Sequence, residues 1–268
     1  MIGFADLHIH TIYSWDGTCT PSAVLKYVTD HTDLSIIAIT DHNEIRGALM
    51  ARELALAYEI QVITGSEVTT SEGHLLALYI EDRIPPGKSL LETVLLVGEQ
   101  GGVCVIPHPA ESDKNSIKPA SVRNVLEHPD AARVLVGVET QNSGFFHKFG
   151  PSLGEEISQD LGLSPTGSSD AHILEMIGQS ATQFPGTTAA EFRQALLQGT
   201  TCPVASRLES RLSMVKRWLP RFLLRAAGWV IWSPTPRLPL RFAHVSQIIH
   251  GQRQFETVRE RALFNRSL

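Results

Sequence analysis

The sequence predicts an α/β protein built around a closed or nearly closed barrel of largely parallel strands, followed by a basic, partly helical C-terminal extension. Apolar, strand-like runs alternate with helix-like runs over the first 200 residues. Repeated β-α units of this kind give parallel sheets with right-handed crossovers. The chain has 268 residues, of which 43% are hydrophobic and 19% charged. This composition is that of a globular protein with one sizeable core.

Seven apolar runs are expected to form the strands. The run 35–40 is rich in isoleucine, which is typical of a buried parallel strand. Each run is short and is bounded by polar residues or turn signals. The seven expected strands are 3–7, 35–40, 60–64, 74–80, 103–106, 133–138 and 164–168.

Helices are expected between these strands. Thr20 and Pro21 form a helix start, with Thr as the N-cap and Pro at the first helical position. Gly101 and Gly199 mark helix ends. The six expected helices are 21–28, 48–58, 89–100, 122–127, 151–161 and 188–197.

The chain changes character after the expected barrel, which we assign to residues 1–206. Residues 207–268 contain twelve Lys or Arg and three Glu, a net charge of +9, whereas the whole chain carries −5. We expect helices over 214–232 and 243–264, separated by a Pro-rich turn, with Pro220 kinking the first helix or marking its first turn. Three roles stay open for this segment: packing on the barrel or between subunits of a homo-oligomer, contact with a membrane surface, and contact with nucleic acid.

Other features exclude several protein classes. The three cysteines, Cys19, Cys104 and Cys202, are far apart and form no CxxC pair. They therefore argue against a disulfide scaffold or zinc knuckle and for a reduced, cytoplasmic setting. From the first residues of the sequence we expect no signal peptide, and from the lack of a long apolar run we expect no transmembrane helix. The net charge of −5 predicts no stable nucleic-acid partner for the molecule as a whole.

Histidine, aspartate and glutamate gather where the expected strands end. In His8-Ile-His10 and Asp170-Ala-His172, residues two apart on an extended chain point the same way, so both side chains of a pair can bind at one site. The C-terminal ends of barrel strands converge on one rim, where active sites form. The residues at these positions are Asp6, His8, His10, Asp16, Asp41, His42, Glu67, His108, Glu139, Asp170 and His172.

His74 does not fit this pattern, because it begins its expected strand. Two explanations remain open from the sequence. The strand runs antiparallel to its neighbours, or the loop before it curls back over the rim.

Together these motifs resemble the PHP (polymerase and histidinol phosphatase) family of metal-dependent phosphoesterases, and in particular its small stand-alone members. The matching motifs are Asp6-Leu-His-Ile-His-Thr11, Ser14-Trp-Asp-Gly17, Ile39-Thr-Asp-His42, Gly65-Ser-Glu-Val68 with Gly73-His74, Ile106-Pro-His-Pro109 and Ser169-Asp-Ala-His172. The resemblance covers roughly residues 1–205. It implies a distorted (β/α)₇ barrel, in agreement with the seven expected strands.

The resemblance also implies a site for two to three divalent ions, Mn²⁺, Fe²⁺ or Zn²⁺. Glu67 would bridge two ions, of which one is held by His8, His10 and Asp170 and the other by His74 and His108. Asp16, His42 and His172 would hold the third. Many members have His where Asp16 stands, and an aspartate there favours Mn²⁺ or Fe²⁺ over Zn²⁺ slightly. Glu67, Asp170 and His172 are the expected catalytic residues, with His172 a general acid if one ion is absent.

Supporting roles are expected for further residues. Asp6 and Asp41 would orient ligands by hydrogen bonding, and Glu139 would do so or contact the substrate. Arg46, Lys114 and Lys148 follow strands and could bind a phosphate.

The expected reaction is hydrolysis of a small phosphate monoester, such as a nucleotide, a sugar phosphate or histidinol phosphate, by a metal-activated water. Two alternatives remain. An amidohydrolase barrel also begins with HxH, but it uses a carboxylated lysine after strand four, where this sequence has none. A non-catalytic, structural metal site is the other, because PHP domains of bacterial DNA polymerases can be structural.

Overall fold

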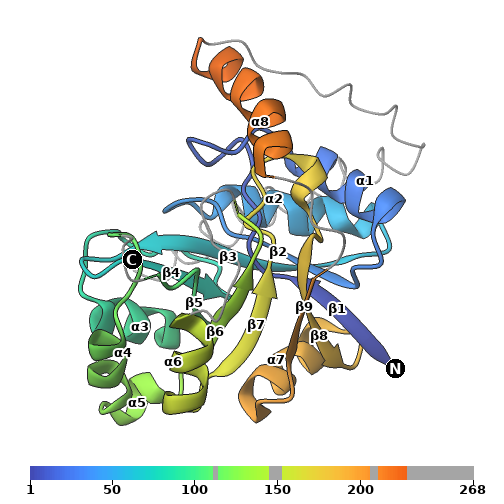
Figure 1. Ribbon diagram of the computed structural model, residues 1–268. Coiled ribbons are helices and arrows are strands. Elements are labelled where there is room, and N and C mark those ends of the chain that lie inside the picture. Colours follow the sequence, from blue (N-terminus) through green and yellow to red (C-terminus); the bar gives the residue numbers. More distant parts are fainter. Residues whose placement is uncertain (111–113, 145–152, 206–210, 228–268) are drawn as a thin grey trace, which may run out of the picture. The chain divides into compact units, whose positions relative to one another are not determined.

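A computed structural model describes residues 1–110, 114–144, 153–205 and 211–227 (Figure 1). All seven predicted strands are present, and two further strands follow them. The strands are β1 (Ile2–Asp6), β2 (Ile36–Ile39), β3 (Gln61–Thr69), β4 (His74–Leu78), β5 (Val103–Ile106), β6 (Leu135–Asn142), β7 (Ser164–Ser168), β8 (Ser180–Pro185) and β9 (Cys202–Ala205).

These strands form one nine-stranded sheet with the order β7-β6-β5-β4-β3-β2-β1-β8-β9. The sheet curls into a nearly closed barrel, because β7 lies against β8 and β9 and a parallel bridge joins Ile9 to Ala171 just beyond β1 and β7. The predicted barrel class is therefore confirmed. Of the six pairs among the seven predicted strands, four are parallel, as expected, and only β4 runs against its neighbours. β8 is also reversed, so four of the eight strand pairs in the described residues are antiparallel. β8 and β9 were missed because their short runs, Ser180–Pro185 and Cys202–Ala205, lack a strong apolar pattern.

The expected helices connect the strands, and several begin or end a few residues from the predicted bounds. Thr20 caps the first of them, since Ala23 N–H donates to its hydroxyl at 3.2 Å. Ser89 and Thr188 each form a capping box with a glutamate three residues later. The helices are α1 (Pro21–His31), α2 (Arg46–Leu54), η1 (Ala55–Ala57), α3 (Leu90–Glu99), α4 (Pro119–Leu126), α5 (Pro129–Ala132), α6 (Leu153–Leu161), η2 (Leu174–Met176), α7 (Ala189–Gln198) and α8 (Arg211–Ala226).

The strands bury both faces, which explains their continuous apolar runs. Ile37 and Ile39 of β2 pack in the cluster that contains residues of α1 to α6. Ile36 and Ala38 point the other way, into a second cluster with Phe184 and residues of α7. Alternation along a strand therefore fixes the register of the barrel and the direction of each side chain at its rim.

Helix α8 covers part of the predicted helix 214–232 and contains Pro220 within it. Met214 is buried, and Val215 and Trp218 pack against the larger core cluster. The Pro-rich turn and the predicted helix over 243–264 lie outside the described residues. None of the helices in the described ranges has both the length and the apolar character that crossing a bilayer requires.

Candidate metal centre

His8 and His10 leave the end of β1 and point into the barrel rim. The Nε2 atom of His8 lies 3.2 Å from Glu67 Oε2 and 3.4 Å from Asp170 Oδ1. The Nε2 atom of His10 lies 3.3 Å from the same two oxygens. The HxH pair therefore converges with one carboxylate from β3 and one from the end of β7, as the sequence predicts.

Glu67 presents its second oxygen to a different pair of imidazoles. Its Oε1 lies 2.8 Å from His74 Nδ1 and 3.0 Å from His108 Nε2. The structure decides the position of His74: β4 runs antiparallel to β3, with His74 opposite Thr69, so the start of β4 is at the rim. Glu67 itself lies inside β3, which extends to Thr69, and does not follow the strand as expected.

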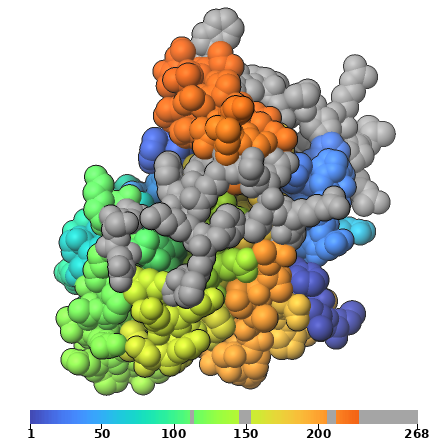
Figure 2. Space-filling model, viewed as in Figure 1, coloured from blue at the N-terminus to red at the C-terminus, as the bar shows by residue number. Residues whose placement is uncertain are grey.

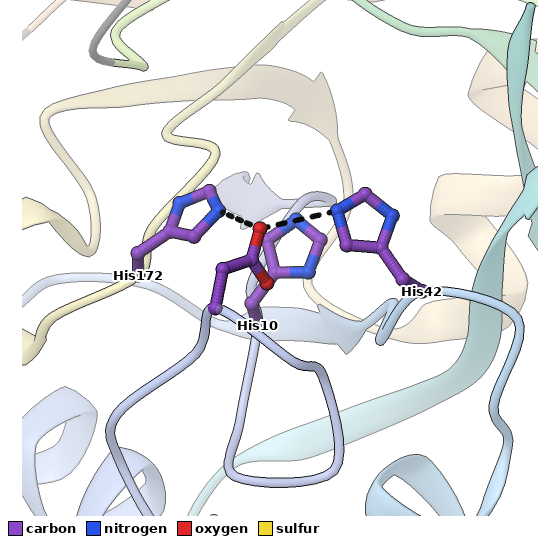
Figure 3. A group of neighbouring side chains, drawn as sticks. His10, His42 and His172 are labelled. Carbon is purple, nitrogen blue, oxygen red and sulfur yellow. Dashed lines mark hydrogen bonds and ion pairs between the residues drawn. The ribbon is translucent and has the colours of Figure 1, made fainter. Parts of the chain in front are cut away.

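Asp16 collects a third set of side chains. Its Oδ2 lies 3.3 Å from His42 Nε2 and 3.1 Å from His172 Nε2. Figure 3 shows the imidazoles of His10, His42 and His172 converging on this point, with dashed lines for the two ion pairs. His42 also reaches towards the first set, because its Nδ1 lies 3.1 Å from Glu67 Oε2.

These close charges shift the ionisation of the side chains. Burial opposes the charged form of His172, but the hydrogen bond to Asp16 and the charge of Asp170 outweigh it and raise its pKa to about 9. Burial alone would raise the pKa of Glu67, yet the charges of His8 and His42 hold it well below its usual value. Burial together with the neighbouring His172 lowers the pKa of His10 to about 4.

The donor set fits divalent ions. The buried Nε2 atoms of His8 and His10 make no hydrogen bond to the described residues, although both face carboxylate oxygens. A buried polar nitrogen lowers the stability of the fold unless it binds a hydrogen-bond partner or an ion. Mixed imidazole and carboxylate ligands suit Zn²⁺, Fe²⁺ and Mn²⁺. Within each of four groups the potential ligand atoms lie within 4.8 Å of one another: His10, Asp16, His42 and His172; His8, His108 and Asp170; His8, His10 and Glu67; His42, Glu67 and His74.

Two sequence models of known protein families match this chain. A sequence model of the PHP domain matches residues 6–128, and one described as PHP-associated matches residues 152–201. The chain belongs to the PHP family. The family is one of metal-dependent phosphoesterases, in agreement with the cluster of potential ligands in this structure.

Relatives of this PHP protein cover different shares of it. An uncharacterized protein of Methanocaldococcus jannaschii is 40% identical over 115 residues, which are 39% of this chain and 67% of that protein. The error-prone DNA polymerase of Mycobacterium tuberculosis is 31% identical over 101 residues, 37% of this chain and 9% of the polymerase. A two-domain Bacteroides vulgatus structure containing a predicted PHP-like metal-dependent phosphoesterase has a TM-score of 0.63 at 21% identity, covering 82% of this chain and 70% of its own, and shows the shared fold.

Glu139 supports the PHP site from behind. It lies within β6 and does not follow the strand as expected. Its Oε1 lies 3.2 Å from His8 Nδ1, and its Oε2 accepts a hydrogen bond from the backbone N–H of His108 at 2.8 Å. Such a contact fixes the direction of an imidazole whose other nitrogen faces the site.

Asp41 and Ser14 act together on the turn after His10. The Asp41 carboxylate accepts hydrogen bonds from Thr11 N–H at 2.6 Å and from Ser14 N–H at 3.1 Å. Ser14 Oγ lies 3.0 Å from His10 Nδ1 and accepts a hydrogen bond from His42 N–H at 2.7 Å. Ser14 stands in one of the matching motifs, and no role was predicted for it. Its spacing of four residues from His10 is the signal that could have predicted this contact.

Asp6 links the first strand of the barrel, β1, to the chain segments on either side of the Asp170-Ala-His172 motif. Its carboxylate accepts backbone hydrogen bonds from Ser169 at 3.0 Å and Gly178 at 2.9 Å, and from His8 at 3.4 Å. Complete burial raises its pKa to about 6. Asp6 therefore orients both metal-ligand motifs, DLHIH and SDAH, through their backbone.

Two candidate ligands have strained backbones. His108 has φ 33° and Asp170 has φ 51°, in the left-handed region that non-glycine residues seldom adopt. Such strain persists where the surrounding structure fixes the residue, often at functional sites.

The structure describes two of the three basic side chains that were expected to contact phosphate. Arg46 is exposed, pairs with Glu44 at 2.6 Å and lies over the ring of Tyr13. Lys114 is exposed and adjoins Asn115, whose carbonyl accepts a hydrogen bond from His74 N–H at 2.7 Å. Lys148 lies outside the described residues.

Proposed function

We propose that this chain hydrolyses small phosphate monoesters at a site for two to three divalent ions. The observation that carries this proposal is the division of the Glu67 carboxylate: Oε2 faces His8 and His10, while Oε1 faces His74 and His108. A carboxylate shared in this way suits two adjacent ions, and Asp16 with His42 and His172 would hold a third.

In this proposal the side chains hold and orient the reacting groups. Bound divalent ions would lower the pKa of water and offset the negative charge of a phosphate. Glu67 and Asp170 supply negative charge between the imidazoles, and Glu139 keeps His8 in one orientation. His172 would be a ligand when the third ion is bound. Without that ion its pKa is raised to about 9, so it is protonated at neutral pH and could give a proton to a leaving oxygen.

The accessible side of the cluster suits a small substrate. His42, His74, Asp170 and His172 each have 12–14% of their side chains exposed, whereas His8, His10 and Glu67 have at most 1%. A substrate would therefore approach from the first group. We propose Arg46, Lys114 and Lys148 as candidate phosphate contacts.

The test is a screen for phosphate release. The chain is purified with Mn²⁺, its ion content is measured, and a panel of nucleotides, sugar phosphates and histidinol phosphate is assayed alongside phosphodiesters and amides. We expect release from at least one monoester and loss of release in His10→Ala. An ion-loaded chain that releases phosphate from no monoester, or that cleaves an amide instead, would refute the proposal.

A structural metal site is the second candidate, favoured by the match to a DNA polymerase. His10→Ala distinguishes the two functions. A structural site predicts a lower melting temperature and no turnover to lose, whereas a catalytic site predicts loss of turnover.

A further inference from the structure

Helix α8 makes polar contacts with the loop that carries Asp16. We define the Asp16 loop as residues 12–17. The Arg225 guanidinium donates to the carbonyl of Ile12 at 2.7 Å and to the carbonyl of Gly17. The Trp218 indole N–H donates to the carbonyl of Asp16 at 3.1 Å. Three carbonyls of one short loop are thus bound by one helix, which Figure 2 shows in orange beside the blue surface of the N-terminal part of the chain.

The same helix binds the segment that follows His172. The guanidinium of Arg221 donates to both oxygens of Glu175, at 2.8 and 2.9 Å. Glu175 comes three residues after His172 and belongs to η2. Paired hydrogen bonds of this kind fix orientation as well as distance. Helix α8 therefore connects the two chain segments whose side chains, Asp16 and His172, meet at 3.1 Å.

Apolar packing holds α8 in this position. Met214 is buried, and the rings of Trp218 and Phe222 stack with centroids 4.7 Å apart. Phe222 also contacts Trp15 of the Asp16 loop edge-on, with centroids 6.1 Å apart. The opposite side of the helix carries exposed residues, among them Lys216 and Leu223.

The Asp16 loop belongs to no helix or strand, so its geometry depends on hydrogen bonds. Ser14 N–H donates to Asp41, and α8 donates to the loop carbonyls. The end of the loop returns to the residue before its start: a Cβ at Gly17 would lie 2.1 Å from the carbonyl oxygen of Thr11. Metal ligands must be held within about 0.5 Å of their working geometry, which loops achieve less well than helices or strands.

We propose that α8 is a positioning element for the ion position formed by Asp16, His42 and His172, with Trp218 and Arg225 as its positioning residues. This inference rests on the proposed metal site. It assigns to the basic extension a role in ion binding: the helix holds the backbone of the Asp16 loop so that the carboxylate faces the two imidazoles.

The test measures ion binding in full-length variants. Arg225→Ala removes two donors, and Trp218→Phe removes the indole N–H while keeping a ring to stack on Phe222. Lys216→Ala is the matched control, because it removes an exposed charge from the other side of the same helix. Asp16→Ala shows the binding curve that lacks this ion position. Mn²⁺ bound per chain is measured by elemental analysis over a titration, together with the melting temperature.

We expect Arg225→Ala and Trp218→Phe to weaken one class of Mn²⁺ position by about 10–100-fold, the range for residues that orient ligands. The weakened class should be the one missing in Asp16→Ala, and Arg225→Lys should restore part of the affinity. Lys216→Ala should bind as wild type does. Wild-type binding by Arg225→Ala, or an equal weakening of all classes with a lower melting temperature, would overturn the inference. Ion binding without phosphate release would instead refute the proposed function alone, and a wild-type chain that binds no ion would refute both.

Discussion

The Nδ1 atom of His74 lies 2.8 Å from Oε1 of Glu67, across two antiparallel strands. The reversed direction of β4 brings its first residue to the rim where β1, β2 and β3 end. A strictly parallel barrel would place the start of that strand at the opposite end. One antiparallel strand thus adds a potential ligand to the site without an additional loop.

This relationship predicts unequal effects of two substitutions. Glu67→Gln removes a charge that faces two pairs of imidazoles. It should lower Mn²⁺ affinity at two positions by more than the roughly 10–100-fold that is typical for residues that only orient the ligands. His74→Ala should weaken one position and spare the others. Mn²⁺ titration with elemental analysis checks both variants. Equal binding curves for the two would contradict the bridging role of Glu67.

Bound ions should also stabilise the fold. Ligands that bind the native state alone add about 2.7 kcal/mol at a hundredfold excess over Kd. We therefore expect a higher melting temperature in Mn²⁺ than in EDTA, with a clearly smaller difference in His10→Ala. Differential scanning fluorimetry measures this difference. The same difference in wild type and His10→Ala would show that the stabilising ions bind elsewhere.

The sequence predicted the rim of this barrel better than its sheet. His8, His10, Asp170 and His172 were found because spacing of two residues on an extended chain fixes side-chain direction locally. Strand direction depends on pairing between distant segments, so the position of His74 stayed open and β8 and β9 were missed. The hydrogen bond of Ser14 to His10 and the contacts of α8 likewise depend on tertiary packing, which hydrophobic periodicity does not reveal.

Ion affinity should rise with pH through the range where His172 loses its proton. The pKa of His172 is raised from 6.5 to about 9, so its protonated form stabilises the ion-free fold below pH 6.5 and this contribution disappears as pH rises through about 9. An ion must displace that proton at neutral pH. We expect Mn²⁺ affinity to increase by up to about tenfold per pH unit between pH 7 and 9, because one proton is released. Calorimetry in two buffers with different ionisation enthalpies measures the proton release directly. A Mn²⁺ affinity that does not change with pH would contradict the role of His172 as an ion ligand.

Glu139 tests the contribution of orientation alone. Glu139→Gln keeps the size of the side chain but removes the charge beside His8 Nδ1, which lies 3.2 Å away. We expect a loss of about 10–100-fold in Mn²⁺ affinity or turnover, with the melting temperature in EDTA little changed. Gln141→Ala, a partly buried change two residues further along β6, is the matched control. If the Glu139→Gln variant bound Mn²⁺ as wild type does, the charge of Glu139 would not be required to orient His8 for ion binding.

Asp6 should contribute to stability in the absence of any ion. Its buried carboxylate joins β1 to the segments that contain Ser169 and Gly178, and so fastens the first strand to the last metal-binding motif. Asp6→Ala removes an acceptor from buried backbone N–H groups, each of which costs roughly 1–3 kcal/mol when unsatisfied. We expect the free energy of unfolding in EDTA to fall by about 2–5 kcal/mol, measured by urea denaturation at an unchanged m-value. Asp6→Asn keeps an acceptor oxygen of the same shape and should lose less. If Asp6→Ala were as stable as wild type in EDTA, the hydrogen bonds from Ser169 and Gly178 to Asp6 would not stabilise the closed barrel.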